Sequence, residues 1–322
     1  MANTGRKYTF FDKGAEALRR TLGEEPFTDE SGTYHPTYVC PLCLTAFWGK
    51  AVEEEDGELT LEHAVEESRG GREILLTCKK CNNRSGSQLG RHAKLREKVR
   101  RFEEAITGAR DGETFRIRLD PGHEGQDVGA LATFTRREDG SPHIRINVLQ
   151  DHSNPEHLAT FSDKMESASE VDGIPDLSFG VQWRPGYIAN RARVADLRSA
   201  YLVAFALLGY RWLLTNPSLD KVRRQIQEPD EEVLSGYMFA PPENLDSGRR
   251  VVLIKEPEPL IWIQLDREGV FLPPIQGRAD FYEHMLEEYF GTNLNLRGHE
   301  VQWPTKLEMF ADFRDAPYEG PE

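Results

Sequence analysis

The sequence predicts an α+β protein of two domains. One observation is a pair of Cys-x-x-Cys motifs that enclose a strand-like segment and precede a basic amphipathic helix pattern. A second is a series of short alternating segments beyond residue 110, interrupted by apolar helical patterns, which is typical of a mixed α+β domain. The third is the length of 322 residues, which fits two cores. We place the domains at residues 1–110 and 111–322, because Asp111-Gly112 is a turn signal.

The N-terminal domain is predicted to contain two helices and a pair of short strands. A helix is expected over residues 11–23, and an exposed acidic hairpin tip over 53–57, where like charges repel and a glycine permits a turn. Residues 59–63 alternate as a strand does, and a short apolar segment at 73–77 leads to the second cysteine pair. The second helix begins at residue 82 or 87 and ends at 106, shortly before a glycine.

The C-terminal domain is predicted to mix strands with helices. The most apolar helical pattern of the chain predicts a buried helix that runs through Val194, Leu197, Tyr201, Ala204 and Leu208. The other predicted elements are strands at 115–119, 130–135, 144–149, 177–183, 251–254, 260–264 and 270–272, and a helix at 281–290.

Composition and the apolar runs limit the class of protein. The charged fraction of 29% and the hydrophobic fraction of 38% are those of a folded globular chain. The first residues lack the apolar stretch of a signal peptide. The longest uncharged apolar run, between Arg198 and Arg211, is shorter than the ~20 residues that span a bilayer. We therefore expect a cytoplasmic protein with no membrane partner, in which reduced cysteines bind metal.

The four cysteines predict a structural zinc site. Cys40 and Cys43 form one Cys-x-x-Cys pair, and Cys78 and Cys81 form the other, so that no cysteine is left over. Each pair can present two thiolates to one side of a tight turn, and two such turns make a tetrahedral four-sulfur site for Zn²⁺. Because protein atoms fill all four coordination positions, this zinc is expected to have a structural role, as a staple between the two turns, and not a catalytic one. The simplest alternative is a zinc ribbon that serves only as a structural or binding module.

A histidine between the two cysteine pairs suggests chemistry beyond the staple. His63 follows a carboxylate, Glu62, and the second cysteine pair is followed by Asn82. A neutral imidazole can take a proton from water, as phosphodiester hydrolysis requires. The oxygens of Glu62 and Asn82 are donors suited to Mg²⁺ or Mn²⁺. A single histidine on a strand is more often a packed or surface residue, and Asn82 can equally be a helix cap.

Basic residues gather next to the second cysteine pair although the net charge of the chain is −14. Eleven of them lie between Arg69 and Arg101, with only Glu73 and Glu97 as acids, whereas residues 111–322 supply the acidic surplus. Charges farther apart than about one Debye length (~8 Å) are largely screened, so a local basic surface can bind phosphate. A solvated helical face is the alternative. The candidate contacts with DNA phosphates are Lys79, Lys80, Arg84, Arg91, Lys94 and Lys98.

The segment over residues 59–86, LTLEHAVEESRGGREILLTCKKCNNRSG, resembles the HNH endonuclease family. The resemblance covers residues 36–95 and implies a zinc-stapled ββα-metal module that cuts DNA with one divalent ion. It implies that His63 is the general base, that Glu62 is the acidic metal ligand, and that Asn82 occupies the metal-ligating position of the helix. His92 is either the last histidine of the signature or a phosphate contact.

The segment departs from the family pattern at three places. Glu62 stands where the family usually has aspartate. The middle asparagine of the signature has no clear counterpart, since Arg72 or Glu73 falls near its position. The proline that usually follows the base is absent, and Val65 and Glu66 are found there. These differences bear on the metal geometry more than on the fold.

We therefore expect a metal-dependent DNA endonuclease, an enzyme of phosphodiester hydrolysis. The acidic C-terminal domain is expected to regulate it or give it specificity, with a small molecule or a protein as the candidate partner. By family analogy alone, such a protein would serve bacterial restriction or anti-phage defence. The alternative is a non-catalytic zinc-ribbon module that binds nucleic acid or a protein partner. A third possibility is a nuclease that is silent until a ligand engages the C-terminal domain.

Overall fold

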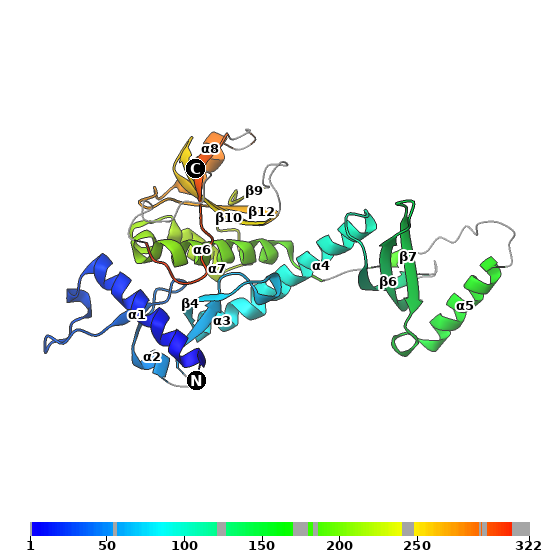
Figure 1. Ribbon diagram of the computed structural model, residues 1–322, viewed down its shortest axis with the longest axis horizontal. Coiled ribbons are helices and arrows are strands. Elements are labelled where there is room, and N and C mark those ends of the chain that lie inside the picture. Colours follow the sequence, from blue (N-terminus) through cyan, green and yellow to red (C-terminus); the bar gives the residue numbers. More distant parts are fainter. Residues whose placement is uncertain are drawn as a thin grey trace. The chain divides into compact units, whose positions relative to one another are not determined.

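The computed structural model shows a mixed α+β fold (Figure 1). It describes residues 2–53, 57–120, 127–169, 180–182, 186–239, 248–289, 291 and 295–310. The chain forms two compact units. Residues 1–93 and 188–322 form the first, here called the main unit, and residues 94–187 form the second, here called the inserted unit. This division does not follow the boundary predicted at 110/111, because the chain leaves the main unit earlier and later returns to it.

The main unit begins with a long helix and the first cysteine pair. Helix α1 (Ala2–Leu22) is longer than the helix predicted over 11–23, and Gly23 ends it with a φ of 81°. Strands β1 (Thr37–Val39) and β2 (Ala46–Trp48) pair antiparallel around the first cysteine pair. Helix α2 (Lys50–Glu53) follows; it contains the first residue of the predicted acidic hairpin tip, and residues 54–56 of that tip lie outside the described residues.

A two-stranded hairpin followed by a helix occupies the centre of the N-terminal segment. Strand β3 (Leu59–His63) pairs antiparallel with β4 (Glu73–Cys78), with a register shift between Glu62 and His63. Helix α3 (Lys79–Ser85) starts at once, and continues through a π-helical turn over Gly86–Gly90 into α4 (Arg91–Ile106). Both strands and the helix end at 106 were predicted. The predicted helix start at 82 or 87 is wrong, because Cys78 caps the helix and its first residue is Lys79.

The longest helix runs through the core of the main unit. Helix α6 (Ala189–Thr215) contains a non-helical residue, Gly209, with a φ of 64°. Tyr201 and Trp212 on this helix are fully buried, which confirms the predicted apolar helix. Helix α7 (Leu219–Gln227) packs on α6. In the main unit, α6 has the N-terminal elements on one side and a sheet on the other (Figure 1).

That sheet is antiparallel with the strand order β13-β10-β11-β12-β9. The strands predicted at 251–254, 260–264 and 270–272 are confirmed, and so is the helix at 281–290, whose last residue lies outside the described part. The bounds are β9 (Met238–Phe239), β10 (Gly248–Glu256), β11 (Leu260–Asp266), β12 (Glu268–Leu272), α8 (Phe281–Tyr289) and β13 (Arg297–Val301).

The inserted unit is an antiparallel sheet with its own core. Its strands are ordered β7-β6-β5-β8, and edge-to-face contacts among Phe102, Phe115 and Phe134, with ring centroids 5.2–5.9 Å apart, form the centre of the core. The strands predicted at 115–119, 130–135 and 144–149 are confirmed; of the one predicted at 177–183, residues 180–182 form a strand and the others lie outside the described chain. The bounds are β5 (Glu113–Asp120), β6 (Val128–Arg136), β7 (Pro142–Val148), α5 (Pro155–Ser169) and β8 (Gly180–Gln182).

One hydrophobic core joins the two chain segments of the main unit. It includes Leu18 and Leu76 from the N-terminal segment together with Phe205, Ile263 and Phe281 from the C-terminal segment. The N-terminal segment is therefore not a separate domain with a core of its own. Within the part of the chain that the structure describes, no helix is both long enough and apolar enough to cross a membrane.

Candidate metal centre and adjoining polar site

Local turns shape both cysteine pairs. In the first pair, the Leu44 N–H donates to the Cys40 carbonyl at 2.9 Å, and the Cys40 N–H donates to the Thr45 carbonyl at 3.0 Å. Leu44 has a left-handed φ of 58°, which closes this turn. In the second pair, Cys78 is the N-cap of α3, and its sulfur accepts from the Cys81 N–H at 3.4 Å. Each turn therefore brings its two sulfurs to one side.

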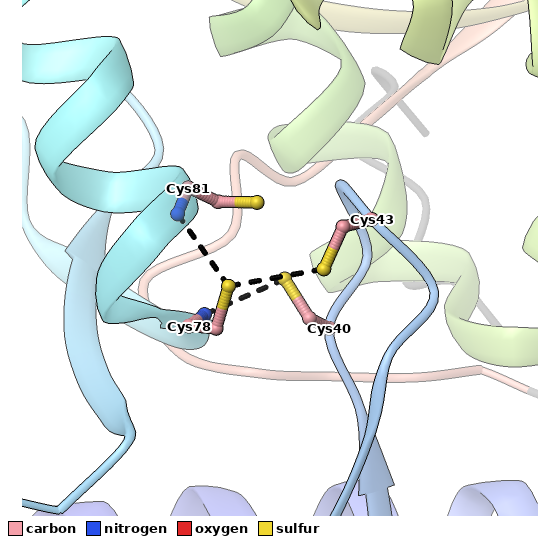
Figure 2. A group of neighbouring side chains, drawn as sticks. All are labelled: Cys40, Cys43, Cys78 and Cys81. Atoms are coloured by element: carbon pink, nitrogen blue, oxygen red, sulfur yellow. Dashed lines mark hydrogen bonds between the residues drawn. The ribbon is translucent and has the colours of Figure 1, made fainter.

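The four sulfurs form one cluster (Figure 2). All of them lie within 4.8 Å of one another, and the Cys43 and Cys78 sulfurs are 3.8 Å apart. A zinc tetrahedron with bonds of about 2.3 Å places its sulfurs about 3.8 Å apart. The Cys78 N–H also donates to the Cys40 sulfur at 3.4 Å, which ties the two cysteine pairs together. The predicted cysteine cluster is confirmed, and its spacing fits a zinc ion.

Proton sharing among the sulfurs favours thiolates at two of the four positions. Hydrogen bonding with the Cys40 sulfur lowers the pKa of Cys78 to about 7. The same interaction holds the pKa of Cys43 well below the usual thiol range. Metal binding requires deprotonated thiols, so the cluster already favours part of the charge that a divalent cation needs.

Helices from the C-terminal segment hold the first cysteine turn in place. The hydroxyl of Tyr201 on α6 donates to the Pro41 carbonyl at 2.5 Å. The amide of Gln227 on α7 donates to the Leu42 carbonyl at 2.6 Å. Both accepting carbonyls lie between Cys40 and Cys43, so the geometry of the sulfur cluster depends on residues more than 150 positions away in the sequence.

The carboxylate of Glu62 is buried and held through one of its two oxygens. The Thr77 hydroxyl donates to Oε2 at 2.9 Å, and the Arg198 guanidinium forms an ion pair with the same oxygen at 2.8 Å. The side chains of Glu62 and Arg198 are each only 6% exposed. No residue in the described part of the chain donates a hydrogen bond to Oε1. The second oxygen of Glu62 is thus the one that can bind a cation.

The amide of Asn82 lies against the strand that carries Glu62. Its Nδ2 donates to the Leu61 carbonyl at 3.4 Å, a long hydrogen bond between α3 and β3. Because a carbonyl can only accept, the nitrogen faces the strand, and Oδ1 is the amide atom that can accept or bind a cation. Among the described residues, none donates to this Oδ1. Asn82 therefore contacts β3 at Leu61, the residue before Glu62.

His63 lies at the end of β3 and is half-buried. The register shift with β4 falls between Glu62 and His63, and such irregularities re-aim side chains next to functional sites. No hydrogen bond to the imidazole is found among the described residues. Apart from the cysteines, the described chain holds no group of three His, Cys, Asp or Glu side chains within ligand distance. An amide or water oxygen must therefore complete any cation site at Glu62.

His92 is buried and hydrogen-bonded to the backbone of the main unit. Its Nδ1 accepts a hydrogen bond from the Ile188 N–H at 3.0 Å, and its exposed fraction is 8%. Burial lowers its pKa, and the nearby charge of Arg191 adds to this effect. A side chain this buried does not offer the phosphate contact that was one of its two predicted roles.

The basic residues divide into exposed and paired groups. Arg69 is buried in ion pairs with Asp196 and Asp266, and Arg101 pairs with Glu113. The predicted phosphate contacts are mostly accessible: Lys79 is half-buried, and the exposed ones are Lys80, Arg84, Arg91, Lys94 and Lys98. Lys79, Lys80 and Arg84 also line a cavity of about 390 Å³ beside the cysteine cluster.

Sequence reasoning missed the partners of Glu62. Arg198 lies 136 positions from Glu62 and belongs to the helix that was predicted only as core. The sequence did indicate that Arg198 has an anionic partner, because an arginine at a buried helix position needs one. Nothing in the sequence, however, indicates which carboxylate that partner is.

Comparison of the chain with models of known protein families, with curated proteins and with solved structures finds no match. The functional interpretation therefore depends on the site itself.

Proposed function

We propose that this protein is a metal-dependent DNA endonuclease with a zinc-stapled catalytic module. The observation that carries the proposal is that the carboxylate of Glu62 is held through only one of its two oxygens. Thr77 and Arg198 hold its Oε2, which leaves Oε1 for a cation. Carboxylates that bind metals are commonly oriented by such partners. The neighbouring residue is a histidine, and Asn82 reaches the same strand from the following helix.

The proposed roles follow from the chemistry of each side chain. The four cysteines hold Zn²⁺, which fixes the start of α3 to the strands. Glu62 Oε1 and Asn82 Oδ1 are hard oxygen donors, suited to Mg²⁺ or Mn²⁺. His63 takes a proton from the water that attacks phosphorus. A divalent cation bound here supplies positive charge against the negative charge that develops on the departing 3′-oxygen.

The order of elements supports the same proposal. An antiparallel hairpin, β3–β4, is followed directly by α3. The HNH resemblance implies this ββα arrangement, with the base and the acidic ligand on the first strand and the remaining ligand on the helix. Such a likeness of arrangement supports the activity without establishing it.

DNA is the proposed substrate because the accessible basic residues follow the cysteine cluster along one helical segment. Lys80, Arg84 and Arg91 are exposed and can contact phosphates. The acidic surplus elsewhere is largely screened at physiological salt. A role in bacterial restriction or anti-phage defence rests on the family resemblance alone. Regulation by a small molecule or protein through residues 111–322 is likewise a proposal.

A second candidate is a non-catalytic zinc module that binds nucleic acid or a protein. The ion pair between Glu62 and Arg198 favours it, because the buried carboxylate is already neutralised and needs no cation for charge balance. In this case Glu62 serves stability alone, and the exposed basic residues serve binding.

Cleavage of supercoiled plasmid tests the two candidates. The wild-type protein should nick the plasmid in Mg²⁺, and His63→Ala should not, although its zinc content and thermal unfolding stay unchanged. His143→Ala, which replaces a half-buried histidine on β7, is the matched control and should cut normally. Cutting by His63→Ala at the wild-type rate would reject the assigned base. A DNA gel shift without cutting in any metal, from wild-type protein, would favour the second candidate.

A further inference from the structure

A separate cavity lies at the connection between β3 and β4, which begins directly after the candidate base. Its volume is about 230 Å³, and the connection between β3 and β4 forms one side of it. Ala64 and Val65, which line the cavity, directly follow His63 in the chain. The opposite side comes from the C-terminal segment, through Arg249 and Trp303. A ligand in this cavity would therefore contact the chain segment that directly follows His63.

An arginine and an indole form a fixed wall of the cavity. The Arg249 guanidinium lies over the Trp303 ring at 5.8 Å from its centroid, within cation–π range. Arg249 also donates to the Gly70 carbonyl at 3.1 Å, and to the carbonyl of Arg69. The guanidinium is thus held by both the indole and the β3–β4 connection. Planar groups of this kind are the surfaces on which nucleobases stack.

The connection itself is closely packed where Gly71 approaches Val65. A Cβ at Gly71 would overlap the carbonyl oxygen of Val65, so only glycine fits this approach of the chain to itself. The shape of the connection that lines the cavity is therefore set by backbone contact. Arg72, the next residue, is exposed and also lines the cavity.

Among the residues that the structure describes, the lining carries positive charge and no carboxylate. Arg72 and Arg249 are its charged residues, although the chain as a whole has a net charge of −14. Two guanidinium groups and an aromatic ring suit an anion that has a planar part. The volume lies below the ~300–1,000 Å³ of pockets for drug-sized ligands, so it suits one base and not a larger molecule.

We propose that this cavity binds one unpaired nucleotide of the DNA substrate, next to the phosphate that is cut. Its base stacks on the Trp303–Arg249 wall, and Arg72 contacts its phosphate. A base in an intact duplex is stacked and paired and cannot enter, so the preferred substrate is single-stranded DNA or DNA with an unpaired nucleotide. The choice of DNA, and the relation to the cut phosphate, rest on the proposed function.

Binding measured without cleavage tests the proposal. The full-length zinc-loaded protein carries His63→Ala and is studied without Mg²⁺, so that no substrate is consumed. Fluorescence anisotropy gives its affinity for a labelled single-stranded oligonucleotide and for a duplex of the same sequence. We expect tighter binding of the single strand. We also expect Trp303→Leu and Arg72→Gln each to weaken single-strand binding about tenfold, and Trp303→Phe to weaken it less, because it keeps an aromatic face.

Matched controls separate the cavity from general effects of charge and aromatic surface. Trp48→Leu removes an indole that is 65% exposed, and Arg297→Gln removes an exposed arginine on β13; both should bind as the parent does. Zinc content and thermal unfolding show whether each variant is folded. Parent-like binding by folded Trp303→Leu and Arg72→Gln overturns the proposal. Equal affinity for single strand and duplex overturns the requirement for an unpaired nucleotide.

The same variants distinguish failure of this proposal from failure of the proposed function. If the wild-type protein cuts no DNA but the cavity variants lose single-strand binding, the nucleotide site stands and the nuclease assignment fails. If the wild-type protein cuts DNA and the folded cavity variants bind and cut normally, the nuclease assignment stands and the nucleotide site fails.

Discussion

His92 accepts a hydrogen bond from the backbone N–H of Ile188, and this bond joins the two points at which the chain leaves and re-enters the main unit. Ala93 is the last residue of the first segment, and Ile188 is the first residue of the second. The 94–187 segment is therefore an insertion between two positions that are already in contact. Near the same place, Arg191 on α6 pairs with Asp230 at 2.6 Å.

The insertion should be removable. Replacing residues 94–187 with a short Gly/Ser linker should leave a folded main unit. The two ends of the insertion are adjacent, and the core of the main unit includes no described residue of it. We expect one zinc per chain and a single cooperative unfolding transition, measured by metal analysis and circular dichroism. Loss of zinc binding in the shortened chain would show that the main unit depends on the insertion.

His92 should make the main unit sensitive to acid. Burial lowers its pKa in the folded state, so protonation favours the unfolded state. The stabilising contribution of neutral His92 is therefore present above the unfolded pKa of about 6.5, and it is lost as the pH falls below that value. Arg91 and Arg191 add to this effect, and Asp230 opposes it.

The substitution His92→Asn isolates this contribution. Asparagine keeps an acceptor for the Ile188 N–H but does not titrate. Urea unfolding at pH 7.5 and 5.5 should show a smaller loss of stability on acidification for the variant than for the wild type. His35→Asn replaces an exposed histidine and is the control. An identical pH dependence in wild type and His92→Asn would mean that other groups cause the acid sensitivity.

Removing one partner of the ion pair between Glu62 and Arg198 should lower the stability of the protein. Arg198→Leu leaves a buried carboxylate without its countercharge and should destabilise the protein by about 3–5 kcal/mol. Replacing both residues with leucine should recover much of this loss. Chemical denaturation of the two single variants and the double variant measures the coupling. Additive effects would show that the two charges do not interact.

A milder change at the same place tests the orientation of Glu62. Thr77→Val removes the hydroxyl that donates to Oε2 and should cost about 1 kcal/mol of stability. If Glu62 binds the catalytic cation, the Mg²⁺ concentration required for cleavage should also rise by about 10- to 100-fold. A stability loss with no change in the Mg²⁺ requirement would limit Thr77 to a structural role.

The cysteine cluster should be required for folding of the main unit. Cys78→Ser removes a candidate ligand at the N-cap of α3, whose sulfur accepts from the Cys81 N–H. We expect loss of stoichiometric zinc and a large decrease in thermal stability, because structural zinc contributes directly to folding. Thr45→Val, which removes only a hydroxyl near Cys43 at 3.2 Å, should keep its zinc. Full zinc occupancy in Cys78→Ser would exclude a four-sulfur site.

The features that the sequence predicted correctly are mostly local. Cys-x-x-Cys turns, alternating strands and the apolar face of α6 depend on neighbours a few positions apart, so their patterns survive in the sequence. Lys79, the true first residue of the helix, was missed because the cap is a cysteine and not one of the usual polar residues.

The sequence by itself determined the sulfur cluster, the hairpin with its adjacent Glu62 and His63, and most strands, because these follow from spacing along the chain. Only the tertiary structure decided that residues 188–322 complete the core of the N-terminal segment and that Arg198 meets Glu62. It also decided that Trp303 faces the end of the hairpin. These contacts join residues more than 130 positions apart, and their partners are selected by the packing of the whole core, which leaves no local pattern in the sequence.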